Sequence, residues 1–412
     1  LNGMPLSFIE VKIPNNRNGL LAERDRIRSR FKNKKHHHFA NITQLLVFSN
    51  NMEYDSESLV PVEGAFYGTP DYENVSFNCF REEDSRILDH VLPINAGLAD
   101  FILRDNNLLA IKGTPEFATN CSESSPTNRI LTSLFSKERF LFILKYGFAY
   151  VKSTDKEGVK HIQKHIMRYP QLFASLAIQK KLDSGVKKGV IWHTQGSGKT
   201  ALAYYNVKAL SDYFQKQGKI AKFYFIVDRL DLLNQAANEF SKRGLKAVTV
   251  NSKEKFIENI RQIGSSGNSG EAEINVVNIQ KFSEESISRK ADYNINVQRV
   301  YFLDEAHRSY NPKGSFLANL INSDSDAVLI ALTGTPLIGS IKTTAIFGDY
   351  IHTYYYNQSI ADGYTLKLIR EGISTTYKIK IREILEKFEA VKGSIKREEI
   401  FARPEYVSCL TD

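Results

Sequence analysis

Short apolar runs alternate with amphipathic stretches through the second half of the chain. The runs are rich in Val, Ile, Phe and Tyr, which is typical of β-strands. They lie at 189–194, 222–228, 246–250, 274–279, 299–304 and 327–334. The stretches between them have the spacing of apolar positions that favours helices. This rhythm predicts an α/β fold with a parallel, doubly wound sheet.

The first 150 residues have a less regular pattern. Two apolar runs, 6–12 and 42–50, predict strands, and the basic stretch Arg24–Lys35 between them is expected to be a helix or a loop. That stretch could follow a DNA backbone or form a solvated charged face. We predict three domains, with bounds 1–150, 151–342 and 343–412.

Composition narrows the class of protein. A chain of 412 residues is too long for one growing core, and no apolar run approaches the roughly 20 residues that span a bilayer. The net charge of +9 favours a polyanionic partner such as nucleic acid. Cys79, Cys121 and Cys409 are odd in number and scattered, so we expect neither disulfides nor a cysteine zinc site, and a reducing cytoplasm fits best. Because the chain starts at Leu1, we expect that residues precede it.

The segment "GVIWHTQGSGKT" (189–200) has the second half of a phosphate-binding loop. His193 stands where the strict motif has its first glycine. Such a loop presents backbone N–H groups at a helix N-terminus, while a lysine neutralises phosphates and a hydroxyl binds Mg²⁺. The predicted nucleotide-binding residues are Gln195, Gly196, Ser197, Gly198, Lys199 and Thr200, with Thr200 also a metal ligand.

A second segment, "VYFLDEAHRS" (300–309), argues against the possibility that residues 189–200 resemble a phosphate-binding loop by chance. Asp304 and Glu305 end an apolar strand, as an acidic Mg²⁺ site in the same sheet requires, although such a pair can also be a solvated strand end. We predict that Asp304 binds nucleotide-bound Mg²⁺, and that Glu305 orients and deprotonates the attacking water. His307 is expected to couple the site to neighbouring segments.

Several motifs together resemble the first motor lobe of superfamily 2 helicases. They are Asp304–His307 (D-E-A-H), Thr333–Pro336 (T-G-T-P), Ile226–Gln235 and Asn278–Phe282. The combination "IWHTQGSGKT", "DEAHRS" and "LTGTPL" resembles the R (restriction, motor) subunit of type I restriction-modification enzymes. In this family the loop often opens with a residue other than glycine.

This resemblance implies roles for further residues. Thr333 and Thr335 would couple the nucleotide site to movement, and Arg229 and Gln280 would contact DNA. The segment Ile166–Gln171 resembles an adenine-reading Q motif. Gln171 would bond to the adenine edge with support from Arg168, which favours ATP over GTP.

The resemblance also implies an N-terminal nuclease. Glu10 and Lys12 share one face of a strand and look like the E-x-K half of a PD-(D/E)xK site, in which carboxylates bind Mg²⁺. By itself, such a pair is more often a solvated ion pair. The family's first metal-binding aspartate is missing upstream, and its Q-x-x-x-Y element is not recognisable in 22–31.

The predicted architecture is thus a partial PD-(D/E)xK nuclease domain (1–150), with a mixed sheet and helices, and a RecA-like motor lobe (151–342). Residues 343–412 would be a linker and the beginning of an incomplete second lobe. The expected function is ATP-driven translocation of duplex DNA, coupled to Mg²⁺-dependent cleavage by a type I site-specific deoxyribonuclease. Its expected partners are double-stranded DNA and the modification (methyltransferase) and specificity subunits.

Two alternatives stay open. The chain could be a helicase or remodelling ATPase without nuclease activity, or a fragment that only binds nucleotide and partners. Because the second lobe is incomplete, we expect the 412 residues alone to be inactive as an ATPase.

Overall fold

A computed structural model describes residues 3–12, 17–53, 64–72, 75–84, 95–261, 272–278, 296–305, 324–336 and 343–366, together with a few single positions. Internal contacts divide the chain into two units, Leu1–Thr365 and Leu366–Asp412. All of the described strands lie in the first unit. No described helix is long and apolar enough to cross a membrane.

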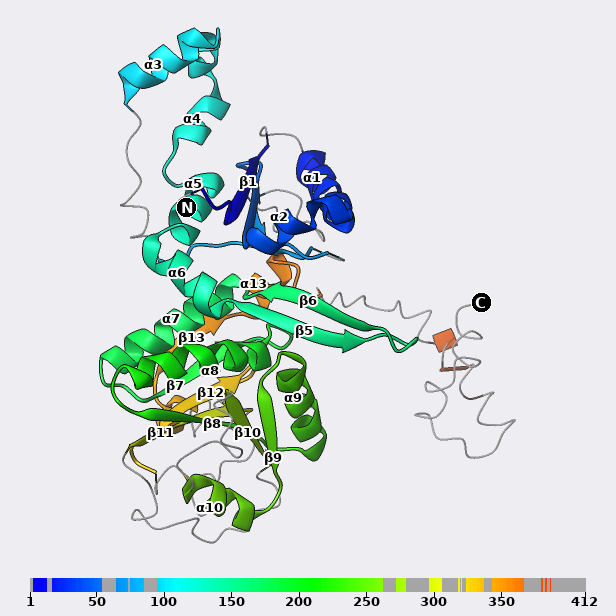
Figure 1. Ribbon diagram of the computed structural model, residues 1–412, viewed down its shortest axis with the longest axis vertical. Helices are drawn as coiled ribbons and strands as arrows, with labels where there is room; N and C mark the ends of the chain where they lie inside the picture. The colour runs from blue at the N-terminus through cyan, green and yellow to red at the C-terminus, as the bar shows by residue number, and fades with distance from the viewer. Residues whose placement is uncertain are drawn as a thin grey trace. The chain divides into compact units, whose positions relative to one another are not determined.

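A seven-stranded parallel sheet forms the centre of the second half (Figure 1). Its strands are β7 (Lys188–His193), β8 (Ile220–Val227), β9 (Lys246–Val250), β10 (Glu273–Asn278), β11 (Val297–Asp304), β12 (Val328–Thr333) and β13 (Tyr350–Tyr354). They lie side by side in the order β13-β7-β12-β11-β8-β10-β9, and every neighbouring pair is parallel. The predicted doubly wound α/β sheet is therefore confirmed, with strand ends that differ from the predicted ends by one or two residues at most.

Helices cover both faces of this sheet, because neighbouring strand residues point to opposite sides. Ile191 packs in one core cluster with α8 (Lys199–Gln215) and α9 (Leu230–Lys242). Val190 packs in a second cluster with α10 (Lys253–Arg261) and α12 (Thr343–Phe347).

The N-terminal part contains a mixed four-stranded sheet. Its strands are β1 (Ser7–Val11), β2 (Leu45–Ser49), β3 (Ala65–Gly68) and β4 (Phe77–Cys79), in that spatial order. β1 and β2 are parallel, whereas β3 is antiparallel to both β2 and β4. This arrangement confirms the predicted mixed sheet with helices.

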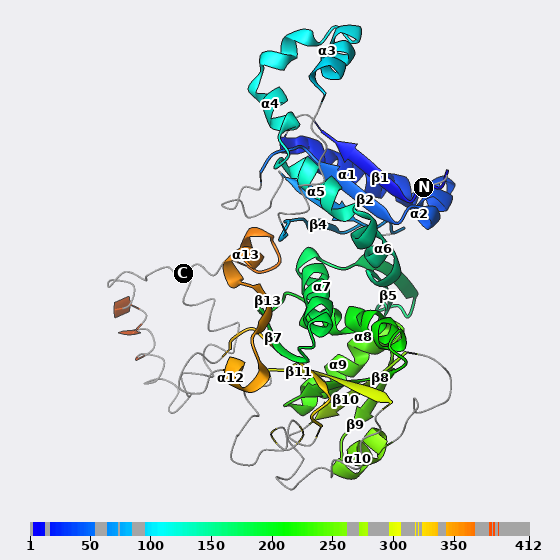
Figure 2. The ribbon, with the colours of Figure 1, turned by 90° about the vertical axis from the view of Figure 1, so that its left-hand side faces the viewer.

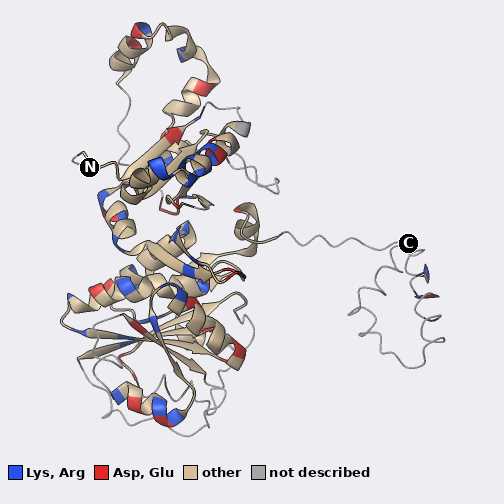
Figure 3. Cartoon of the chain, turned by 45° about the vertical axis from the view of Figure 1, so that its right-hand side comes forward, with Lys and Arg blue, Asp and Glu red and all other residues tan. Residues whose placement is uncertain are grey.

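The basic stretch after β1 is helical. It falls in α1 (Arg17–Lys32) and the short helix η1 (Lys34–His36), followed by α2 (His37–Ile42). Leu20, Ile27 and Phe31 of α1 are buried against β2, because apolar residues recur on one face of the helix. Figure 3 shows basic positions recurring along the outer part of this helix.

A helical segment and a hairpin connect the two sheets. The helices are α3 (Ala96–Asp105), η3 (Leu109–Gly113), α4 (Pro115–Cys121), α5 (Pro126–Leu134) and α6 (Lys137–Tyr146). The antiparallel hairpin of β5 (Phe148–Thr154) and β6 (Lys160–Ile166) leads into α7 (Tyr169–Asp183). One core cluster contains Val47 and Tyr67 of the N-terminal sheet together with Leu172 and Leu202, which explains why residues 1–365 form one unit.

The structure extends the parallel sheet beyond the expected boundary at residue 342. β13 pairs with β7, and α13 (Tyr356–Ala361) follows directly. Gly189 permits this pairing, since a Cβ there would lie 2.4 Å from Cγ1 of Ile351. Residues 343–365 therefore belong to the same unit as the parallel sheet.

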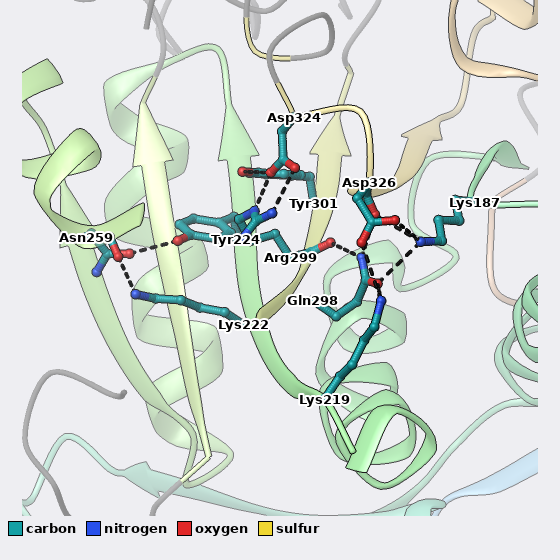
Figure 4. A network of polar contacts seen from close by, with 10 residues as sticks. All are labelled: Lys187, Lys219, Lys222, Tyr224, Asn259, Gln298, Arg299, Tyr301, Asp324 and Asp326. Carbon is teal, nitrogen blue, oxygen red and sulfur yellow. Dashed lines mark hydrogen bonds and ion pairs between the residues drawn. The ribbon is translucent and has the colours of Figure 1, made fainter. Parts of the chain in front are cut away.

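A buried polar network crosses the amino-terminal half of the parallel sheet (Figure 4). Asp324 receives two bonds from the guanidinium of Arg299, one of them at 3.0 Å from Nη2, and a third from the hydroxyl of Tyr301 at 3.1 Å. Asp326, two residues later, has a half-exposed side chain, which pairs with Lys187 and Lys219. The two aspartates thus differ in burial and not in chemistry.

We predict that Asp324→Asn lowers the free energy of unfolding by about 3–5 kcal/mol, because it removes the buried negative charge with which the Arg299 guanidinium pairs. Asp326→Asn should cost at most about 1 kcal/mol, since water screens its pairs. Urea unfolding of both variants measures the difference. Equal losses would contradict this account of the network.

Candidate nucleotide site

The predicted site residues gather at the carboxyl ends of β7, β11 and β12. These strands are neighbours in the order β7-β12-β11, so the segments that follow them meet at one edge of the sheet. α7 lies beside β13 at the same edge (Figure 2). The fold therefore brings together four segments that are far apart in the sequence.

The loop between β7 and α8 has the backbone of an anion-binding turn. Gly196 and Gly198 adopt left-handed conformations, with φ of 81° and 89°, which side-chain-bearing residues rarely adopt. Ser197 donates from its hydroxyl to the carbonyl of Thr194 at 2.7 Å, and this bond closes the turn. Gly198 caps α8, so Lys199 and Thr200 occupy its first turn, where free N–H groups favour an anion.

Gln171 ties the start of α7 to this loop. Its amide oxygen accepts from the backbone N–H of Arg168 at 2.9 Å, and its amide nitrogen donates to the carbonyl of Gly198 at 3.0 Å. A primary amide has two donor hydrogens and two acceptor lone pairs. One of each is used here, so one donor and one acceptor remain for an adenine edge.

Arg168 lies over the same loop. Its guanidinium donates to the carbonyl of Gly196 at 3.4 Å and lies 4.0 Å from the ring centre of Tyr364, a cation–π distance. The hydroxyl of Thr365 lies 3.5 Å from the carbonyl of Gln195. Segment 364–365 therefore borders the predicted adenine side of the loop.

Glu305 connects the loop lysine with the T-G-T-P segment. One carboxylate oxygen lies 3.9 Å from Nζ of Lys199, and the other accepts from the hydroxyl of Thr333 at 3.0 Å. The backbone N–H of Thr335 donates in turn to Oγ1 of Thr333 at 3.1 Å. Glu305 has a φ of 49°, which costs energy in a residue with a side chain and is common at functional sites.

Gly334 makes the close approach of these segments possible. A Cβ at this position would lie 3.3 Å from the backbone nitrogen of Gln195 and 3.6 Å from Nζ of Lys199. The ammonium group of Lys199 also donates to the carbonyl of His193 at 3.3 Å. It is thus held at the mouth of the loop, where a phosphate would lie.

His193 occupies the position of the missing first glycine without blocking the loop. Its side chain is fully buried beneath the loop, and Nε2 lies 2.7 Å from Nδ1 of His352. Burial lowers the pKa of His193 well below its usual value, and the nearby His352 and Lys199 lower it further. The ring is therefore neutral at physiological pH and serves as packing.

Five of the predicted site residues remain: the two predicted Mg²⁺ ligands, and three residues that were predicted to contact DNA or to couple the site to other segments. Asp304 ends β11, and Thr200 lies in the first turn of α8, both partly buried. Nucleotide-bound Mg²⁺ takes only one or two protein ligands, and this pair suits that role. Arg229 begins α9 and pairs with Asp231 at 2.9 Å on the surface. His307 and Gln280 lie outside the described residues.

The predicted nuclease pair belongs to a larger ionic cluster. Nζ of Lys12 lies 2.5 Å from Glu10 and 3.1 Å from Glu23, a buried carboxylate of α1 that belongs to none of the predicted motifs. Arg26 also pairs with Glu23 and lies 3.6 Å from Glu10. The hydrogen bond to Glu10 raises the pKa of Lys12, and Glu23 adds to this effect, so the amine is protonated.

A cleft of about 480 Å³ lies beside this cluster. Its lining includes Lys12, Asn51, Glu116, Asn120 and Asn128. Among the described residues, no three His, Cys, Asp or Glu side chains gather as a metal-binding group. Lys12 thus contributes a cationic group to a cleft that is also lined by amide side chains and by Glu116.

Sequence comparison assigns the chain to a known protein family. The SWI2/SNF2 ATPase family matches residues 169–400, more than half of the chain. The chain therefore belongs to the SWI2/SNF2 ATPase family.

Several relatives of the chain are named as subunits of type I restriction enzymes. A Methanocaldococcus jannaschii protein named for the MjaIXP type I restriction enzyme endonuclease subunit is 25% identical over 439 residues, which cover 100% of this chain and 37% of that protein. The Staphylococcus aureus (strain COL) type I restriction enzyme SauCOLORF180P endonuclease subunit is 30% identical over 257 residues, 60% of this chain and 26% of that protein. The resemblance to the R subunit is thus confirmed, and the chain spans about a quarter to a third of these relatives.

Solved structures resemble the chain more distantly. The DNA-bound Type ISP restriction-modification enzyme LlaBIII is 16% identical, covers 46% of this chain and 15% of its own, and has a TM-score of 0.37. The UvsW helicase from bacteriophage T4 is 14% identical, covers 52% of this chain and 67% of its own, and has a TM-score of 0.32. These likenesses are too weak to add to the sequence comparisons.

We predict that Gly198→Ala weakens nucleotide binding by at least about tenfold, because a Cβ there would lie 2.5 Å from the Gln171 amide and φ would remain left-handed. Gly218→Ala is the matched control, since Gly218 also has a positive φ but has open space around it. Titration with a labelled ATP analogue measures both variants. Equal weakening in the two would show that a general loss of stability, and not the contact of Gly198 with Gln171, is responsible.

Proposed function

We propose that this chain is the nucleotide-binding motor lobe and nuclease-type N-terminal part of the endonuclease subunit of a type I restriction enzyme. The observation that carries the proposal is the geometry around the loop, where Lys199, Glu305 and Thr333 form one connected group. The family membership and the named relatives support it.

In the proposed reaction, the chain binds and hydrolyses ATP. The loop N–H groups and Lys199 hold the phosphates, and the remaining donor and acceptor of Gln171 recognise the adenine edge. Thr200 and Asp304 would hold Mg²⁺, which neutralises phosphate charge when bound. Glu305 would orient and deprotonate the attacking water.

The hydrogen bond between Thr333 and Glu305 suggests how ATP hydrolysis changes the position of the T-G-T-P segment. Thr333 donates to the Glu305 carboxylate, and Thr335 holds the Thr333 hydroxyl in place. A change at the γ-phosphate would therefore alter the T-G-T-P segment directly. We propose that this segment couples ATP turnover to movement along duplex DNA.

The N-terminal sheet is proposed to contribute a Mg²⁺-dependent nuclease. Glu10 would bind the metal, and protonated Lys12 would stabilise the negative charge on the scissile phosphate. The basic residues of α1 are proposed to lie along the DNA backbone (Figure 3). The modification and specificity subunits would supply sequence recognition, and His307, Arg229 and Gln280 stay candidate coupling and DNA contacts.

A second candidate function is a motor without nuclease activity. The ion pairs of Lys12 with Glu10 and Glu23 favour it, because they give both predicted nuclease residues a purely structural use. Cleavage assays separate the two candidates.

Lys199→Ala and Glu305→Gln in the full-length protein should each lower DNA-stimulated ATP hydrolysis by about 10²-fold or more, because one removes phosphate neutralisation and the other the general base. Phosphate release in the presence of duplex DNA gives the rate. Glu239→Gln, at a surface pair with Arg243, is the matched control and should keep full turnover. Unchanged turnover in both site variants would refute the ATPase proposal.

Lys12→Ala in the full-length protein, assembled with its modification and specificity subunits, should abolish plasmid cleavage and leave ATP hydrolysis unchanged, because the two sites use different residues. Lys112→Ala, at an exposed pair with Asp100, is the control lysine. Agarose gels report cleavage, and phosphate release reports turnover. Full cleavage by Lys12→Ala would favour the motor without a nuclease.

A further inference from the structure

A buried carboxylate lies behind the nucleotide site, at a position that no sequence motif marks. The side chain of Asp362 is fully buried and accepts three hydrogen bonds. The hydroxyls of Tyr169 and Tyr354 donate to Oδ2 at 2.6 and 2.7 Å, and Nε of Arg81 donates to Oδ1 at 2.7 Å. These partners come from α7, β13 and the segment that follows β4, so one side chain joins three separate parts of the fold.

The geometry around Asp362 is tightly determined. A buried carboxylate is tolerated only when charged and hydrogen-bonding partners replace its water, so each of the three donors is needed. The rings of Tyr169 and Tyr354 also pack edge to face, with centres 6.0 Å apart. Burial and the neighbouring Asp362 raise the pKa of Tyr169, which keeps its hydroxyl protonated as a donor. Neither tyrosine can shift without breaking a bond in this group.

Both tyrosines are adjacent to the nucleotide site. Tyr169 is the first residue of α7 and lies between Arg168 and Gln171, the two residues proposed for the adenine side. The carbonyl of Tyr354 accepts from the backbone N–H of Thr194 at 3.0 Å, directly before the loop glycines. The bonds of the Asp362 carboxylate go to Tyr169, Tyr354 and Arg81, so any effect on nucleotide must pass through these neighbours.

The N-terminal sheet supplies the positive charge of this group. Arg81 follows β4, and two further contacts run beside it. The hydroxyl of Tyr364 donates to Asn78 of β4 at 3.2 Å, while its ring lies beneath Arg168. Nε2 of His352 lies 2.5 Å from Glu83. The segment 78–83 is thus connected to the adenine side at more than one point.

We propose that Asp362 is a positioning residue for the adenine side of the nucleotide site, and that Arg81 of the N-terminal sheet completes it. Asp362 holds Tyr169 so that Arg168 and Gln171 face the loop. Affinity for the base of ATP then depends on an arginine that does not touch the nucleotide. This inference rests on the proposed ATP function, and it adds a residue and a dependence on the N-terminal sheet that the ATP proposal does not contain.

The test compares two ligands on the full-length protein. A non-hydrolysable ATP analogue uses both the adenine side and the phosphate loop, whereas inorganic tripolyphosphate uses the loop alone. Asp362→Asn and Arg81→Gln should each weaken the analogue roughly tenfold, about the value of one good hydrogen bond, and leave tripolyphosphate affinity within about twofold. Tyr169→Phe removes one hydroxyl and keeps the ring, so it should weaken binding of the analogue in the same direction.

Arg129→Gln is the matched control, because Arg129 forms an exposed pair with Glu53 in the same half of the chain. It should change neither affinity. A double variant, Asp362→Asn with Gln171→Ala, should bind the analogue no more weakly than Gln171→Ala alone, since both act on the same contact.

Equal weakening of both ligands by Asp362→Asn and Tyr169→Phe would overturn the proposal and leave Asp362 a general structural residue. Unchanged analogue affinity in all three variants would also overturn it. Failure of the unmodified protein to bind either ligand would instead refute the ATP function and this inference with it, which distinguishes the two failures.

Discussion

The side-chain amide of Gln171 joins the start of α7 to the nucleotide loop, and the arrangement of the site depends on this connection. It holds the backbone of Arg168 and the carbonyl of Gly198 at once, in a nearly water-free position. Because Gly198 is left-handed and crowded by the same amide, the loop and the helix fix each other. An adenine edge would therefore meet a preorganised donor and acceptor, which reduces the entropic cost of binding.

Two buried aspartates, Asp324 and Asp362, lie toward opposite ends of the strands of the parallel sheet. Asp324 pairs with Arg299 in the amino-terminal half of the sheet, away from the loop, and its partners Arg299 and Tyr301 both lie in β11. Asp362 lies near the carboxyl ends of the strands and takes its charged partner from the N-terminal sheet. Removing one partner of a buried ion pair is strongly destabilising, because the remaining charge stays buried. The second pair thus makes the geometry behind the nucleotide site depend on both sheets.

Much of the fold and of the loop could be predicted from the sequence, because those features depend on local patterns. Apolar runs predicted the strands, and the glycines around Ser197 predicted the turn. The hydrogen bonds that position the site could not be predicted, since Tyr169 and Asp362 are 193 residues apart and Asp362 belongs to no motif. The burial of Glu23 could not be predicted either, because the sequence of a highly charged helix does not show which glutamate is buried. The pairing of β13 with β7 likewise depends on distant residues.

The loop, Gln171 and Glu305 are proposed to form one site for Mg²⁺-bound ATP. Calorimetric titration of the full-length protein with Mg²⁺-ATP and, separately, Mg²⁺-GTP is the sharpest test of this site, because the two ligands share their phosphates and differ at the base edge that Gln171 is proposed to recognise. The expected result is saturable binding of ATP that is at least about tenfold tighter than that of GTP. Equal affinity for the two nucleotides, or no binding of ATP, would contradict the proposed site.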